Sequence, residues 1–175
     1  MKKTATPFTA QLVTFDTTLP FDEVIARLNA QVNKAGSTQF LAQFRNVSGR
    51  EEIEELINGA LGPSGFLYFF ELNHDQWMNI YDPSIHRPHA VVYTIGNPLI
   101  AETIMRHDAH PGYNIPPRLM VLEKPDHSGT EVVYHLPSSV MLAGYVGDDV
   151  EVKTALEGLD EKLDRLVTRI TDDQQ

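Results

Sequence analysis

The stretch FLYFFEL, residues 66–72, decides the fold together with the similar stretch HAVVYTI, residues 89–95. Both are short, rich in aromatic and β-branched residues, and bounded by Pro, Gly, Asn or Asp, which is the pattern of a β-strand. In both stretches, the two faces of the strand are largely apolar. Strands that are buried on both faces need cover on both sides. Helices can cover one face, so the other face needs a partner subunit or a closed cavity.

Three further short runs in the chain have the same β-strand pattern. They are QLVTF at 11–15, RLMVLE at 118–123 and TEVVYHL at 130–136. The last two are separated by KPDHSG, a turn sequence that suits a hairpin. We therefore expect a single sheet with strands near residues 11–15, 66–72, 89–95, 118–123 and 130–136, and helices mainly on one of its faces.

Two helices are expected in the first third of the chain. Residues 20–36 carry apolar side chains at helical spacing, and Gly36 suits the end of that helix. Residues 48–62, SGREEIEELINGALG, indicate a second, shorter helix. Its start has the pattern of a capping box, in which the Ser48 hydroxyl and the Glu51 carboxylate would each accept a backbone N–H.

Two more helices follow later in the chain. Asn97 has the side chain of an N-cap and precedes Pro98, so a helix should begin there. The chain ends with a helix at about 149–171. Its apolar residues form a narrow seam: Val152, Leu156, Leu159, Leu163, Leu166 and Ile170. This seam is typical of a helix docked on its own sheet, and the alternative is a helix that contributes to a dimer.

The composition sets limits on the kind of protein. The chain of 175 residues fits one domain, with residues 1–8 expected to form a flexible tail. The absence of cysteine excludes disulfides and thiolate metal sites and fits a reducing compartment. The net charge of −10 argues against nucleic acids and anionic membranes as partners. We expect a cytoplasmic protein, because no apolar run suits a signal peptide or a membrane span.

The stretch RHDAHPGYNIPPR, residues 106–118, brings His107, Asp108 and His110 close together in sequence. A residue before proline is pushed out of the helical conformation, so Pro111 should exclude His110 from the helix that holds His107. The two imidazoles should then diverge, with His107 partly buried and His110 exposed. We expect a helix end here, and we predict neither a metal site nor a cofactor.

Polar residues also gather at the end of the doubly apolar strand, where His74 lies near Glu71 and Trp77. Polar groups beside a large aromatic ring at a strand end often build one wall of a ligand pocket. The candidate ligand-binding residues are His74, Asn97, His107, Glu71, Trp77 and Arg118. The sequence has no nucleophile elbow, phosphate loop or dinucleotide-binding loop, and it identifies no catalytic residue.

Five motifs occur in a characteristic order. They are FDEVIARLNAQVNKAG at 21–36, Asn73-His74, IGNP at 95–98, NIPPRLMVLE at 114–123 and LPSS at 136–139. This ordered set resembles the domain of unknown function 302 family, also called TT1751-like, with a family-like core over roughly 9–36 and 66–141. Two departures stand out: some relatives carry a cysteine where this chain has Pro117, and the segment 37–65 is longer than in compact relatives.

The resemblance implies a two-layer α+β fold of the TBP-like type, with a curved antiparallel sheet, and it implies a homodimer. It implies no activity, because none is established for the family. Two functional hypotheses therefore stand side by side. The first is a homodimeric module that binds a small molecule or has a structural role. The alternative is a small enzyme in which His74 and His107 serve as acid–base or metal-ligand groups.

Overall fold

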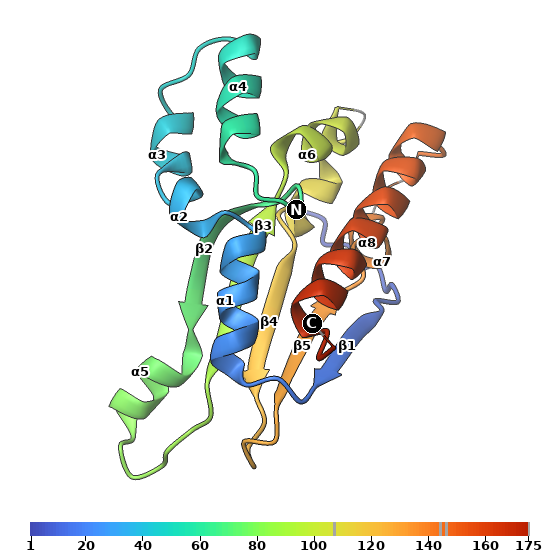
Figure 1. Ribbon diagram of the computed structural model, residues 1–175. Coiled ribbons are helices and arrows are strands. Elements are labelled where there is room, and N and C mark those ends of the chain that lie inside the picture. The colour runs from blue at the N-terminus through green and yellow to red at the C-terminus, as the bar shows by residue number, and fades with distance from the viewer. Residues whose placement is uncertain (107, 144, 146, 175) are drawn as a thin grey trace.

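The computed structural model describes residues 1–106, 108–143, 145 and 147–174. Its centre is a five-stranded antiparallel sheet with the strand order β1-β5-β4-β3-β2 (Figure 1). The strands are β1 (Leu12–Thr17), β2 (Leu67–Asn73), β3 (Ala90–Gly96), β4 (Arg118–Glu123) and β5 (Thr130–His135). Each predicted strand is found within two residues of its expected ends, so the predicted α+β class and the strand positions are confirmed.

The helices are arranged on one side of the sheet and around its two ends. They are α1 (Phe21–Gln31), α2 (Lys34–Ser37), α3 (Phe40–Phe44), α4 (Arg50–Ala60), α5 (His74–Tyr81), α6 (Pro98–Met105), the 3-10 helix η1 (His110–Asn114), α7 (Pro137–Met141) and α8 (Val150–Thr171). Figure 1 shows α1 and α8 over one face of the sheet, with α2, α3, α4 and α6 toward one end and α5 at the other. In the part of the chain that the structure describes, no helix has the length and apolar character needed to cross a membrane.

The seam of α8 packs within its own chain. All six seam residues predicted from the sequence are at most 4 % exposed: Val152, Leu156, Leu159, Leu163, Leu166 and Ile170. They belong to the same buried cluster as the strand residues Leu119, Val121 and Val132. The interpretation of α8 as a helix docked on its own sheet is therefore the one that the structure supports.

The predicted helix over residues 20–36 is divided in two. The carbonyl of Gln31, at the end of α1, accepts bonds from the Ser64 amide at 3.2 Å and from the Ser64 hydroxyl at 2.7 Å. Asn33 then takes a left-handed backbone conformation, with φ of 49°, before the short helix α2 begins. A distant loop thus captures the carbonyl at which the helix ends, which the local sequence does not reveal.

The predicted capping box at Ser48 and Glu51 is wrong. Helix α4 begins at Arg50, and its N-cap is Gly49, which has no side chain to cap it. The backbone N–H of Ser48 instead donates to Glu52 Oε2 at 3.0 Å. Because the N-cap is Gly49, one residue later than expected, Glu52 is the acidic residue that reaches back.

The start and the end of α6 agree with the sequence pattern. Asn97 Oδ1 accepts the N–H of Leu99 at 2.9 Å, so Asn97 is an N-cap. His110 lies outside α6 and begins η1, where its backbone N–H donates to Asp108 Oδ1 at 2.9 Å. The His110 side chain is 74 % exposed, as expected. His107 lies outside the described residues, so its predicted burial stays a prediction.

The two faces of the sheet differ sharply. The face toward α1 and α8 carries strand residues that are at most 3 % exposed: Val91, Tyr93, Ile95, Leu119, Val121, Val132 and Tyr134. The other face, which we call the open face, carries Leu12, Phe70 and Leu72, with exposures of 64 %, 55 % and 51 %. None of the described helices lies over the middle of the open face (Figure 1), and residues of η1 and α7 line a hollow at one end of it.

Candidate functional site

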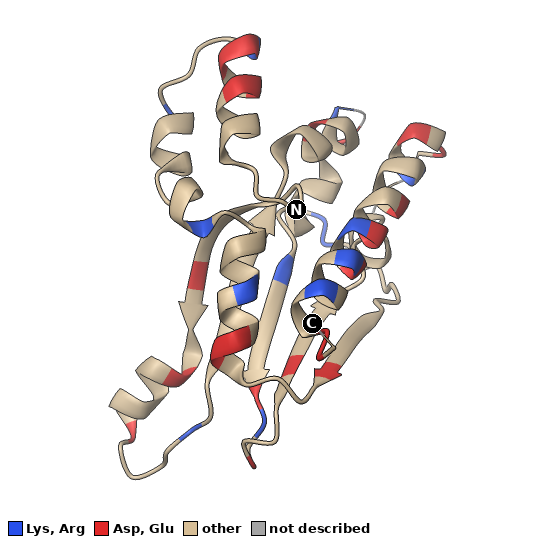
Figure 2. Cartoon of the chain, viewed as in Figure 1, with Lys and Arg blue, Asp and Glu red and all other residues tan. Residues whose placement is uncertain are grey.

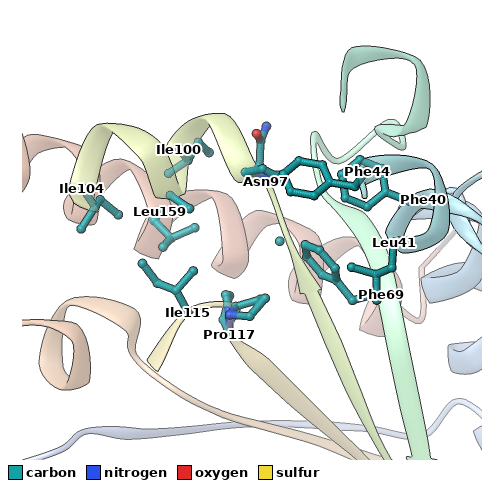
Figure 3. A pocket seen from close by; sticks show the side chains of 14 residues that line it. Phe40, Leu41, Phe44, Phe69, Asn97, Ile100, Ile104, Ile115, Pro117 and Leu159 are labelled. Atoms are coloured by element: carbon teal, nitrogen blue, oxygen red, sulfur yellow. The ribbon is translucent and has the colours of Figure 1, made fainter. Parts of the chain in front are cut away.

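An apolar pocket lies where α3, β2, α6 and α8 meet at one end of the sheet (Figure 3). Its volume is about 200 Å³. It is lined by Phe40, Leu41, Phe44, Phe69, Gly96, Asn97, Pro98, Ile100, Ala101, Ile104, Ile115, Pro116, Pro117 and Leu159. A concave, mostly apolar site of this kind is the usual form of a small-molecule pocket.

One wall of the apolar pocket is aromatic. The ring of Phe40 lies 5.4 Å from that of Phe44 and 5.9 Å from that of Phe69, the latter edge to face. The β2–β3 register shifts between Tyr68 and Phe70, and the intervening Phe69 lines the pocket. A Cβ at Gly96 would lie 3.1 Å from the Phe69 ring, so glycine allows this close approach.

The opposite wall is aliphatic. Ile100 and Ile104 come from α6, Ile115 follows η1, and Leu159 comes from the buried seam of α8 (Figure 3). Ile104 and Leu159 are 0 % and 4 % exposed, so this wall is continuous with the core. A core-anchored wall is held in place by packing, and it gives the pocket a defined shape.

Asn97 has the only polar side chain among the described residues of the pocket lining. Both ends of its amide are already engaged, because Oδ1 caps α6 and Nδ2 donates to the carbonyl of Gly65 at 3.1 Å. The side chain therefore holds the rim in place through these two bonds, which use one of its two N–H donors and one of its two oxygen lone pairs. The structure places the candidate residue Asn97 at the pocket, in a structural role.

The candidate Arg118 lies in a different hollow, on the open face. This second hollow has a volume of about 360 Å³ and is lined by Phe70, Thr94, Tyr113, Asn114, Pro116, Pro117, Arg118, His135, Pro137, Val140 and Met141. Pro116 and Pro117 line both hollows and so separate them. Among the described residues, the buried hydroxyl of Thr94 finds no hydrogen-bond partner, and no ion pair involves Arg118.

The candidate Glu71 belongs to a polar cluster under α1 and α2. Lys34 Nζ donates to Glu71 Oε2 at 2.6 Å and lies 3.4 Å from the Tyr93 hydroxyl, which in turn donates to Asn29 at 2.9 Å. Burial works to raise the pKa of Glu71, but the hydrogen bond from Lys34 and the Lys34 charge hold that pKa below its usual value. Burial raises the pKa of Tyr93. The cluster ties α2 to the sheet.

The candidates His74 and Trp77 lie on α5, away from the apolar pocket. Trp77 Nε1 donates to His74 Nδ1 at 3.4 Å, and Trp77 is 53 % exposed. Asn73 pairs with Val91 at the beginning of β3, whereas Asn97 follows the end of β3. His74 and Asn97 are therefore at opposite ends of one strand and do not share a cavity. His107 lies outside the described residues.

Sequence reasoning missed most of the apolar pocket. Phe40, Phe69 and Leu159 come from three separate parts of the chain, and each resembles an ordinary core residue when read alone. The spacing of Phe40 and Phe44 is that of one helical face, and it was the one local signal for α3. In the ranges that the structure describes, no three His, Asp or Glu side chains gather closely enough to hold a metal ion.

Comparisons with known proteins agree with this fold. No curated protein matches the chain. The fold is similar to the crystal structure of an uncharacterized conserved DUF302 protein from Bacillus stearothermophilus, with a TM-score of 0.58 and 18 % identity over 91 % of this chain and 97 % of that chain. The family model described as a domain of unknown function, DUF302, matches residues 43–170. The match extends through α8 to residue 170 and covers well over half of the sequence, so this chain belongs to the DUF302 family.

Proposed function

We propose that the chain is a binding module whose apolar pocket takes an uncharged, mostly hydrocarbon molecule. The observation that carries this proposal is the pocket lining, in which the one polar side chain, Asn97, already uses its amide within the protein. A charged or strongly polar ligand group would lose its hydration in this pocket and could regain at most what one partly engaged amide offers, which is unfavourable.

The dimensions of the pocket limit the size of the ligand. A dry apolar cavity of about 150 Å³ in another protein accommodates benzene. The volume of about 200 Å³ here suits one or two rings, or a hydrocarbon chain of similar size. The aromatic wall formed by Phe40, Phe44 and Phe69 offers ring edges and faces to a flat molecule.

Toluene and benzoate form a matched pair of probes, because they are similar in size and differ in charge. Titration followed by methyl NMR should give saturable shifts with toluene at Ile100, Ile104, Ile115 and Leu159. Benzoate should bind at least about tenfold more weakly, because its carboxylate would be desolvated without a partner. Ala101→Phe should abolish toluene binding by filling the pocket, and Ala42→Phe is the matched control at an exposed position of α3.

Three results would contradict the proposal. Toluene could give no saturable shifts, benzoate could bind as tightly as toluene, or Ala101→Phe could bind toluene as the wild type does. Methyl signals away from the pocket must be retained in Ala101→Phe, since an added ring in a packed region can disturb the fold.

We also propose that two copies of the chain associate through the open face. The supporting observation is that Phe70 and Leu72 are more than half exposed on a sheet face that none of the described helices covers. Contiguous apolar surfaces of this kind mark interaction sites. Sedimentation velocity at micromolar concentration should show a dimer, and a monomer alone at that concentration would argue against this part of the proposal.

The alternative of an enzyme that uses His74 and His107 has less support. His74 stands at the opposite end of β3 from the helix α6 that precedes residue 107. A cytoplasmic location is also part of the proposal and is supported by the absence of cysteine. The net charge of −10 supports the proposal that nucleic acids and membranes are not partners.

A further inference from the structure

The open face carries a pattern of charge along its strands. Arg118 and His135 lie in one cross-strand row with Thr94 and Leu12, which we call the basic row. Two residues further along each strand is a second row, formed by Leu72, Val92, Met120 and Val133 with Thr14 at the β1 edge, which we call the apolar row. Two residues further again is the acidic row, in which Asp16 pairs with Glu131 across β1 and β5.

The charges at the two ends of the open face are not satisfied by each other within one chain. Arg118 and Glu131 each lack an ion-pair partner among the described residues, whereas Asp16 pairs with Lys124 at 2.6 Å. Glu131 lies opposite Leu122 on β4, and Leu122 is four residues from Arg118 along that strand. The basic row and the acidic row are therefore about 13 Å apart. Figure 2 shows blue near the start of β4 and red near the opposite end of the sheet.

We infer that two copies pack open face to open face about a two-fold axis that runs across the strands, through the apolar rows. This operation places the basic row of each copy over the acidic row of the other. Arg118 then lies over the partner subunit's Leu122, one strand away from the partner subunit's Glu131, and pairs with that glutamate, twice per dimer. The apolar rows meet at the centre. Packed sheets lie about 10 Å apart, a gap that an arginine and a glutamate span together.

The charge pattern also disfavours the other simple way to pack two aligned sheets face to face. A two-fold axis parallel to the strands would place basic row against basic row. Because β4 is the middle strand of the sheet, Arg118 would then face the partner subunit's Arg118. Like charges in an interface are strongly unfavourable. The axis across the strands therefore combines apolar contact with attraction at both ends.

This inference rests on the proposed homodimer. Charge-reversal variants test the Arg118–Glu131 pairing separately from the homodimer itself. Arg118→Glu alone and Glu131→Arg alone each create two like-charge contacts per dimer and should raise the dissociation constant of the dimer at least about tenfold. The double variant, Arg118→Glu with Glu131→Arg, should restore the wild-type constant. A mixture of the two single variants should form a heterodimer, since both of its contacts are then attractive.

A matched control reverses a pair elsewhere on the surface. Arg165 and Glu161 form an exposed pair on α8, with side-chain exposures of 66 % and 71 %, away from the open face. Their reversal, singly or together, should leave the dissociation constant unchanged. Circular dichroism and thermal melts of every variant confirm that a lost dimer is not a lost fold.

Sedimentation equilibrium measures the dissociation constants of the wild type and of each variant. A wild-type dimer that persists in both single variants would overturn the inferred pairing and leave the homodimer in place. Single variants that dissociate and are restored neither in the double variant nor on mixing would also overturn it. A wild type that is monomeric at about 100 μM would overturn the homodimer and the pairing together, since stable dimers are assembled well below that concentration.

Discussion

The two faces of the sheet are built from alternate residues of the same strands, yet they meet different surroundings. On β4, Leu119 and Val121 are 0 % exposed under α1 and α8, whereas Met120 and Leu122 point to the open face. The covered face is apolar over its centre, with the Lys34–Glu71 cluster at one edge. On the open face, apolar residues such as Leu12 and Leu122 share the two outer rows with the charged residues Arg118 and Glu131. A sheet face that is covered by helices of its own chain needs no charge pattern. On a face that binds another copy, a charge pattern fixes the orientation of that copy.

The largest expected difference between the faces concerns Leu119 and Met120, which are adjacent in sequence. Leu119→Ala should lower the free energy of unfolding by about 2–5 kcal/mol, because it removes a fully buried side chain and leaves a cavity. Met120→Ala should cost less than about 1 kcal/mol when the chain is monomeric, because its side chain is only partly buried. Urea unfolding at several protein concentrations measures both.

Protein concentration makes this comparison sharper. The cost of Met120→Ala should grow with concentration, since the lost contact lies in the proposed interface, whereas the cost of Leu119→Ala should not. Equal costs for the two variants in dilute solution would show that the open face is buried within the monomer, and the distinction between the faces would fail.

A smaller effect is expected at Asn97, where the sheet meets α6. Asn97→Ala should lower the free energy of unfolding by about 1 kcal/mol, because the cap of α6 is lost. Asn97→Ala also removes the hydrogen bond from Nδ2 to the Gly65 carbonyl. Asn97→Asp loses that same bond but keeps an oxygen that accepts the Leu99 N–H. Asn97→Asp should therefore be the more stable of the two variants in thermal melts.

The Asn97 variants also test whether the Asn97 amide has a structural role or contacts the ligand. Toluene should still bind to Asn97→Ala, because the amide bonds only within the protein. A variant that keeps its stability and loses toluene binding would instead identify Asn97 as a ligand contact, and the proposed apolar character of the site would need revision.

The smallest effect concerns pH and the polar cluster at the edge of the covered face. Burial works to raise the pKa of Glu71, but the hydrogen bond and charge of Lys34 hold it below the usual value of 4.5. A carboxyl with a lowered pKa in the folded state stabilises the fold fully above its usual pKa, and this stabilisation is lost as pH falls through the folded value. Glu71→Gln should therefore remove part of the loss of stability below pH 4.5.

The size of this pH effect should be below about 1 kcal/mol, as for other partly exposed ion pairs. Glu55→Gln is the control, because Glu55 is exposed on α4 and forms no ion pair with any described residue. Thermal melts between pH 3 and pH 7 compare the three proteins. A Glu71→Gln profile that overlays the wild type would mean that the Lys34 contact contributes no net stability.

Local pattern was sufficient for much of the fold. Alternating β-branched and aromatic residues located all five strands, the seam of α8 identified its buried face, and Asn97 with Pro98 marked the start of α6. These features depend on neighbours within a few residues, because side-chain periodicity and capping act over one or two turns. The apolar character of both strand faces also pointed to the unpaired surface.

Only the tertiary structure decided where α1 ends, which residues form the apolar pocket and how charge is distributed over the open face. Gln31 ends α1 because Ser64, from a distant loop, binds its carbonyl. Phe40, Phe69 and Leu159 meet because four elements converge at one end of the sheet. Arg118 and Glu131 acquire their relation only through strand register. Each of these features depends on contacts between distant segments, and periodicity within one segment carries no information about its partners in space.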